Sequence, residues 1–225
     1  MVTSDTLQYI LEMYETILPS LLETLYMVFF STLFATVIGL PLGIILVITD
    51  KGNLWEKPKL NKILSFIVNI MRSLPFIIMI IALFPLARLI VGTTIGSTAA
   101  IVPLSIAAAP FVARVVESSL REVDWGIIEA SLSSGASTMQ IIFMVMIPEC
   151  LPSLILGITL TIINIIGYSA MAGAIGGGGL GDLAIRYGYQ RFETDVLIAT
   201  ILVLFVLVEI IQCIGNYLAK KVDKR

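Results

Sequence analysis

The stretch from Thr24 to Thr49 contains no charged side chain, and it constrains the fold more than any other part of the sequence. As a tilted helix it is long enough to cross a lipid bilayer. Hydrophobic residues make up 58% of the chain and charged residues 13%. A soluble domain has about half and about a quarter. The sequence therefore predicts an all-α protein with several membrane-spanning helices.

Four more apolar stretches follow, which gives five predicted transmembrane helices. The spans are expected at Thr24–Thr49, Ile63–Arg88, Leu89–Ala113, Cys150–Gly181 and Val196–Ala219. In the first of them Gly39 and Gly43 flank Pro41, a pattern typical of a kinked helix that another helix approaches closely. We expect the whole chain, residues 1–225, to form a single membrane domain.

Before the first span, apolar residues recur at helical spacing. They are Leu7, Ile10, Leu11, Tyr14, Ile17, Leu18 and Leu21. This pattern predicts an amphipathic helix over residues 1–22 that lies in the membrane surface and is broken by Pro19. Because no basic region and small-residue cleavage site mark a secretory signal, the first span is expected to direct insertion itself.

The distribution of Lys and Arg predicts the orientation in the membrane. Ten of them fall in the loops after the first and third spans and in the tail, whereas three, Arg88, Arg186 and Arg191, fall on the other side. The N-terminus is therefore expected outside and the C-terminus in the cytoplasm.

Composition also bears on chemistry. The chain has no His and a net charge of −2, so it offers neither a histidine-based metal or catalytic site nor a basic surface for nucleic acid. Cys150 and Cys213 are far apart in apolar surroundings and are interpreted as small buried residues. No Gly-Lys pair occurs, which excludes a P-loop. We expect no enzyme activity and no cofactor in this chain.

A polar segment, about residues 114–148, separates two apolar blocks. Asp124 predicts the start of one short helix, and Ser137 with Gln140 predicts the start of a second. Gly135 lies between them, where a positive φ suits a tight reversal. The first helix is expected to place Ile127, Ile128 and Leu132 in one exposed apolar stripe. The alternatives are a docking surface and a plain solvated connector.

The residues of this segment resemble the coupling loop of ABC importer permeases, with its pattern E-A-A-x3-G and a later I-x-L-P. Here the pattern is Glu129-Ala130-Ser131, then Gly135, then Ile147-Pro148. Ser131 replaces the second Ala, and Val145 and Ile147 replace Ile and Leu. These changes keep size and polarity.

Further motifs resemble the methionine-import permeases, from about Leu21 to the C-terminus. They are Arg72–Ile78 (R-S-L-P-F-I-I), Ala109–Arg114 (A-P-F-V-A-R), Gly167–Gly173 (G-Y-S-A-M-A-G), Gly178–Gly181 (G-G-L-G) and Tyr187–Tyr189 (Y-G-Y).

The resemblance implies the type I permease fold and a homodimer in the bacterial cytoplasmic membrane. It also implies two cytoplasmic ATPase subunits that bind ATP-Mg, and an extracytoplasmic methionine-binding protein, in many cases a lipoprotein. By motif position, Glu129, Ala130, Ser131, Gly135 and Pro148 would belong to the ATPase-coupling loop. Met171 would be the side chain that closes the gate between the two copies. Transport would proceed by alternating access.

Small and mildly polar residues gather in the fourth span, around Asn164. Tyr168, Ser169, Met171 and Gly173 are expected to line the pathway, the alternative being ordinary helix packing. The run Gly176–Gly181 formally fits G-x-G-x-x-G, but it follows an apolar helix rather than a strand. We therefore interpret it as a flexible end of the span and not as a dinucleotide site.

Two ionisable residues lie inside predicted spans. Arg72 is about 15 Å along the helix from Lys62, and Glu209 is about 16 Å from Lys220. Such residues are functional candidates, and they could neutralise each other. Arg72 could instead extend to the inner interface.

Other classes of function stay open at this point. An importer for another small amino acid would share the coupling loop. An ion-coupled secondary transporter would need several intramembrane carboxylates, and only Glu209 qualifies. A membrane scaffold without transport activity is the third alternative.

Overall fold

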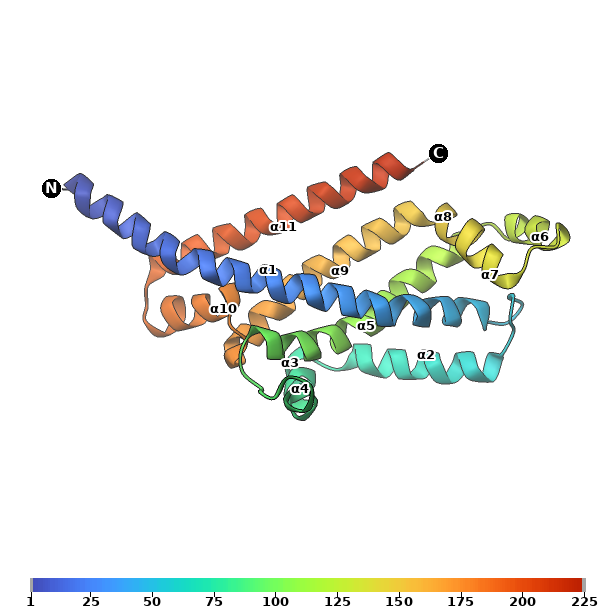
Figure 1. The fold of residues 1–225 in the computed structure, drawn as a ribbon, viewed down its shortest axis with the longest axis horizontal. Coiled ribbons are helices and arrows are strands. Elements are labelled where there is room, and N and C mark those ends of the chain that lie inside the picture. Colours follow the sequence, from blue (N-terminus) through green and yellow to red (C-terminus); the bar gives the residue numbers. More distant parts are fainter. Residues whose placement is uncertain (1, 224–225) are drawn as a thin grey trace. The chain divides into compact units, whose positions relative to one another are not determined.

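The computed structural model describes residues 2–223, with side chains from residue 13 onward, and every regular element among them is a helix. The long helices are α1 (Val2–Ile48), α5 (Ser97–Arg121), α9 (Leu151–Ala172) and α11 (Thr194–Val222). Figure 1 shows them with the shorter elements between them. These shorter elements are α2 (Pro58–Ser73), α3 (Phe76–Ala82), α4 (Phe84–Val91), α6 (Trp125–Ser133), α7 (Thr138–Gln140), α8 (Ile147–Glu149) and α10 (Gly179–Leu183). Two π-helical segments are η1 (Ile141–Met146) and η3 (Ala184–Gln190), and η2 (Gly173–Gly177) is a kink with non-helical backbone at Ile175 and Gly176.

Four helical segments are long and apolar enough to span a membrane, and α2 with α3 makes a fifth if this broken pair is one span. The first, fourth and fifth predicted spans are confirmed as helices. The second is wrong as a continuous helix, because α2 ends at Ser73 and Leu74 takes the extended backbone that a following proline favours. The third begins at Ser97 rather than Leu89 and continues to Arg121.

The predicted break at Pro19 is also wrong, since α1 runs through both Pro19 and Pro41. A proline removes one backbone hydrogen bond but does not end a helix that neighbouring contacts stabilise. The side chains of Leu7, Ile10 and Leu11 lie outside the described residues, so the surface location of residues 1–22 stays a prediction.

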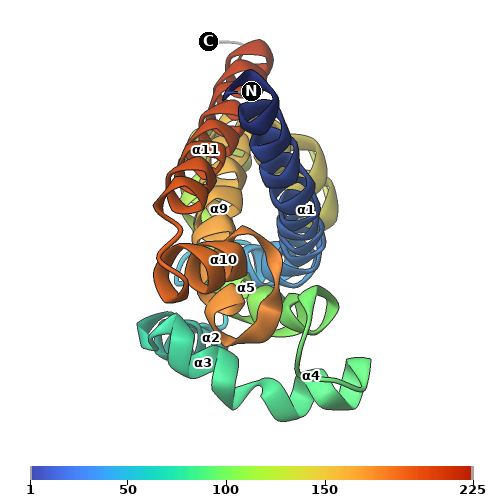
Figure 2. The ribbon, with the colours of Figure 1, turned by 90° about the vertical axis from the view of Figure 1, so that its left-hand side faces the viewer.

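The chain forms two compact units. Unit 1 comprises residues 1–32, 76–105 and 162–210. Its apolar core contains Leu180, Leu183 and Val196, against which Ile17 and Leu21 of α1 pack. Figure 2 shows α10 close to α1 and α11. Burial of these apolar side chains is what fixes the short helix α10 against the long helices.

Unit 2 comprises residues 33–75, 106–161 and 211–225. Its core contains Leu46, Val68 and Ala113. The predicted close approach at Gly39 and Gly43 is confirmed. A Cβ on Gly39 would lie 2.7 Å from the carbonyl oxygen of Ala109, and one on Gly43 would lie 2.6 Å from that of Ala113. Only glycine lets the backbones of α1 and α5 approach this closely.

Candidate functional site

The polar segment of unit 2 forms two short helices with a sharp reversal between them. Asp124 caps α6, and its carboxylate accepts a hydrogen bond from the Gly126 N–H at 2.7 Å. Ser137 and Gln140 cap α7 reciprocally, as predicted. Residues 114–121 continue α5, so the segment between α5 and α9, which we call the coupling segment, begins at residue 122 rather than 114.

Gly135 makes the reversal, with φ of +82°. Its N–H donates to the carbonyl of Leu132 at 2.9 Å, and the N–H of Ala136 donates to that of Ser131 at 3.1 Å. These two bonds satisfy the last carbonyls of α6 in the pattern of a Schellman motif. Residues with a side chain strongly disfavour this φ, so the predicted tight reversal at Gly135 is confirmed.

A concave surface of about 820 Å³ opens along this helix pair. It is lined by Asp124, Gly126, Ile127, Ala130, Ser131, Ser134, Gly135, Ala136, Gln140, Met144 and Val145. Three of the predicted coupling residues, Ala130, Ser131 and Gly135, are among them. Glu129 and Pro148 are exposed but do not line the concavity.

Exposed apolar side chains accompany the concavity. Ile127, Leu132, Met139 and Met144 are exposed, whereas Ile128 is buried. The predicted stripe was therefore wrong for Ile128, which faces the interior of the unit. Large apolar side chains left in contact with water next to a concave surface are typical of a protein–protein interface.

The predicted pathway residues of α9 fall into two groups. Met171 is 48% exposed, whereas Ser169 is 2% exposed and donates to the carbonyl of Ile166 at 2.8 Å. Tyr168 stacks on Phe76, with ring centroids 4.4 Å apart. Gly173 is buried, and a Cβ on it would lie 2.4 Å from the Asp182 nitrogen. Ser169, Tyr168 and Gly173 thus pack within unit 1, and Met171 faces outward.

The glycine run after α9 takes positive φ at Gly176, Gly178 and Gly179, which ends the span. The Gly179 N–H donates to Oε2 of Glu23 at 2.7 Å, and the Leu180 N–H donates to the hydroxyl of Thr24 at 2.9 Å. A helix precedes this run, so it lacks the strand that a dinucleotide site requires. Two side chains of α1 satisfy these amides instead.

The two ionisable residues of the predicted spans fall in different units. In unit 2 the Arg72 guanidinium lies 5.9 Å from the ring centroid of Phe111, which is within reach of a cation–π contact. Glu209 is exposed on α11. Their pairing stays a prediction. Among the described residues no group of three Cys, Asp or Glu side chains could hold a metal ion.

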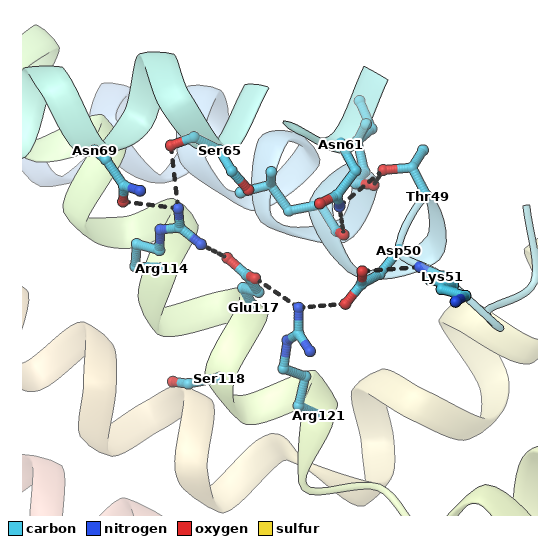
Figure 3. Close-up of polar contacts among 12 residues, drawn as sticks. Thr49, Asp50, Lys51, Asn61, Ser65, Asn69, Arg114, Glu117, Ser118 and Arg121 are labelled. Atoms are coloured by element: carbon cyan, nitrogen blue, oxygen red, sulfur yellow. Dashed lines mark hydrogen bonds and ion pairs between the residues drawn. The ribbon is translucent and has the colours of Figure 1, made fainter. Parts of the chain in front are cut away.

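Sequence reasoning missed a chain of charges on α5, which Figure 3 shows. Glu117 lies between Arg114 and Arg121, and Arg121 in turn reaches Asp50 at 2.6 Å. The signal was available, because positions 114, 117 and 121 share one face of a helix. Asp50 could not be identified as the partner of Arg121 from a local pattern, because the two residues are 71 positions apart in the sequence.

The several apolar membrane helices, with a capped and exposed helix pair between two of them, have the type I ABC importer permease fold, as the match to a family model and to a solved importer shows. The chain belongs to the family of binding-protein-dependent transport system inner membrane components, whose family model matches residues 39–224.

Its relatives are similar along nearly the full length. A probable D-methionine transport system permease of Vibrio cholerae is 50% identical over 203 residues, which is 90% of each chain. A methionine import system permease of Bacillus subtilis is 51% identical, covering 90% of this chain and 91% of the relative. A solved inward-facing structure of the MetNI methionine ABC transporter matches with a TM-score of 0.91 and 46% identity. This match covers 92% of this chain and 96% of that one.

Proposed function

We propose that this chain is the permease subunit of an ATP-driven methionine importer in the bacterial cytoplasmic membrane. The observation that carries the proposal is the exposed α6–α7 pair with its concave, partly apolar surface. The names of the relatives support methionine as the cargo. Two copies of the chain would enclose the pathway, and each would dock one cytoplasmic ATPase subunit that binds ATP-Mg.

The α6–α7 pair would couple nucleotide binding to transport. When ATP draws the two ATPase subunits together, the docked helix pairs move with them, and the spans open toward an extracytoplasmic methionine-binding protein. Hydrolysis then restores the inward-facing state. Nucleotide can shift the permease only through contacts that differ between the two states, and this docking surface is where such contacts would act.

Met171 would form the gate. Its side chain is exposed on α9 in the single chain, which leaves it free to meet the same residue of a second copy. A thioether is apolar enough to seal a narrow passage and flexible enough to move aside. Tyr168, Ser169 and Gly173, which pack within unit 1, would hold the gate segment in place rather than line the passage.

The docking role can be tested with Gly135→Pro. Proline cannot adopt a φ of +82° and removes the N–H that bonds to Leu132, so the α6–α7 reversal should be lost. We expect methionine uptake by reconstituted transporter to fall to background, with insertion into the membrane unchanged.

Gly92→Pro is the matched control. Gly92 has φ of +87° and its N–H donates to the carbonyl of Arg88 at 2.9 Å, but it ends α4, outside the coupling segment. It should lose an equal amount of local structure and still transport. Normal uptake by Gly135→Pro, or equal loss in both variants, would contradict the docking role. Competition of labelled methionine uptake by other small amino acids tests the cargo.

A further inference from the structure

Among the side chains that the structure describes, Glu117 is the one charged side chain that is buried, with 6% of its surface exposed. It lies in the last part of α5, five residues before the coupling segment begins at residue 122. A buried carboxylate is costly unless it is paired, so its partners are essential to the structure around it.

The partners of Glu117 are two arginines of α5, one of which also reaches the end of α1. Its Oε1 accepts from Arg121 at 3.0 Å, and its Oε2 accepts from Arg114. Arg121 also donates to Asp50, which follows the end of α1. We call Asp50, Arg114, Glu117 and Arg121 the α5 ion-pair chain (Figure 3).

The α5 ion-pair chain continues into α2 through Arg114. Its Nη2 donates to the Ser65 carbonyl at 3.2 Å and to Oδ1 of Asn69 at 2.8 Å. A second link joins α2 to α1, because Nδ2 of Asn61 donates to the Leu46 carbonyl at 2.6 Å. These bonds join α2 and the end of α1 to the stretch of α5, residues 114–121, that leads into the coupling segment.

The other end of the coupling segment is joined to the same place. The hydroxyls of Ser119 and Ser153 are 2.9 Å apart, and Ser153 donates to Oε1 of Glu122 at 3.0 Å. Ser153 lies in the first turn of α9 and Ser119 in the last turn of α5. Hydrogen bonds therefore join the two ends of the segment that carries α6 and α7, and we call these joined ends its base.

From this geometry we propose that Glu117 is a positioning residue for coupling. It joins the base of the coupling segment to α1 and α2 through the α5 ion-pair chain, so that a displacement of α6 and α7 moves these helices together with α5. This inference rests on the proposed function. It adds the route by which the movement leaves the docking surface.

The test uses Glu117→Gln and Asp50→Asn in the complete transporter with its ATPase and binding protein. Each variant keeps the size of the side chain and removes one charge of the α5 ion-pair chain. Glu56→Gln is the matched control, because Glu56 is an exposed carboxylate in the loop between α1 and α2. The readouts are co-purification of the ATPase subunit and the amount of methionine accumulated per ATP hydrolysed.

We expect both variants to co-purify with the ATPase as the wild type does. The amount of methionine accumulated per ATP hydrolysed should fall by about fivefold or more, because a factor of about five is the low end of the coupling that proteins show between two sites. Asp50→Glu, which keeps the charge, should retain most of the wild-type ratio. If Glu117→Gln does not fold, Asp50→Asn decides alone, since the Asp50 side chain is 31% exposed at a helix end.

An unchanged ratio in Asp50→Asn overturns the inference. So does a fall in uptake and hydrolysis in equal proportion, because that is the signature of lost folded protein rather than lost coupling. A wild-type chain that binds no ATPase subunit would overturn the proposed function itself, and the inference with it.

Discussion

At the scale of single residues, the close approach of α1 to α5 depends on the absence of a side chain. A Cβ on Gly43 would lie 2.6 Å from both the Ala113 carbonyl oxygen and the Val116 Cβ. We expect Gly43→Ala to destabilise the folded chain by about 1–3 kcal/mol, the usual cost of overpacking. Thermal unfolding in detergent measures the change.

Ile38→Ala provides the comparison for Gly43→Ala. Ile38 is exposed on the same helix, so its truncation leaves the α1–α5 contact intact. Its unfolding temperature should stay within the error of the wild type. If Gly43→Ala is equally silent, the two helices are not in close contact at this point.

The thiol of Cys150 also reports its surroundings. Burial raises the pKa of Cys150 to about 11, and the nearby carboxylates of Glu122 and Glu149 act in the same direction. At pH 8 only about one thiol in a thousand is then the reactive thiolate. In a Cys213→Ser background, alkylation of Cys150 by iodoacetamide should therefore be slow at pH 8 and should accelerate as the pH rises toward 11.

Denaturation in detergent gives the reference rate for Cys150, because unfolding removes the burial that raises the pKa. Labelling of the folded chain at pH 8 as fast as that of the denatured chain would show that Cys150 is accessible. Because the pKa of Cys150 is higher in the folded chain, the protonated thiol stabilises the folded state below the unfolded pKa of about 9. This contribution to the free energy of unfolding is lost as the pH rises from about 9 to about 11.

At the scale of elements, α10 depends on two side chains of α1. Thr24 accepts from the Leu180 N–H, and Glu23 accepts from the Gly179 N–H. Thr24→Ala should cost about 1 kcal/mol locally. Hydrogen–deuterium exchange of the peptide that contains Leu180 should accelerate by about fivefold. Glu15→Gln, an exposed change elsewhere on α1, should leave this peptide unaffected.

The elements that the sequence predicted well are those whose determinants are local. The caps at Asp124 and Ser137 and the reversal at Gly135 each depend on residues within one helical turn. The prolines show the opposite case. Pro75 follows a helix end, whereas Pro19 and Pro103 lie inside continuous helices. The outcome depends on what packs against each proline, and a single sequence does not contain that information.

The candidate site also has features that the sequence predicted and features that it could not predict. The resemblance of Glu129, Ala130 and Gly135 to a coupling loop pointed to the exposed α6–α7 pair, whose docking role stays a proposal. It could not separate Met171, which is exposed, from Ser169, which is buried, because both lie in one motif. The pairing of Asp50 with Arg121 was out of reach, since it depends on how α1 and α5 pack.

At the scale of the whole molecule, the number of crossings decides which loops share a side of the membrane. If the broken pair α2–α3 crosses, the chain has five spans and its termini lie on opposite sides. If it does not cross, four spans put residues 84–92 on the same side as the loop after α1, and they move the coupling segment to the outer face. An ATPase in the cytoplasm could then not reach it.

Cysteine labelling from outside the cell distinguishes these two arrangements, in a background with Cys150 and Cys213 replaced by serine. The excess of Lys and Arg after α1 predicts that Lys59→Cys faces the cytoplasm. Leu89→Cys and Arg191→Cys should then react with a membrane-impermeant maleimide in intact cells, and Lys59→Cys only after permeabilisation. Protection of all three cysteines in intact cells, with labelling of each after permeabilisation, would show that α2 and α3 form a re-entrant pair, and the coupling segment would then lie on the outer face.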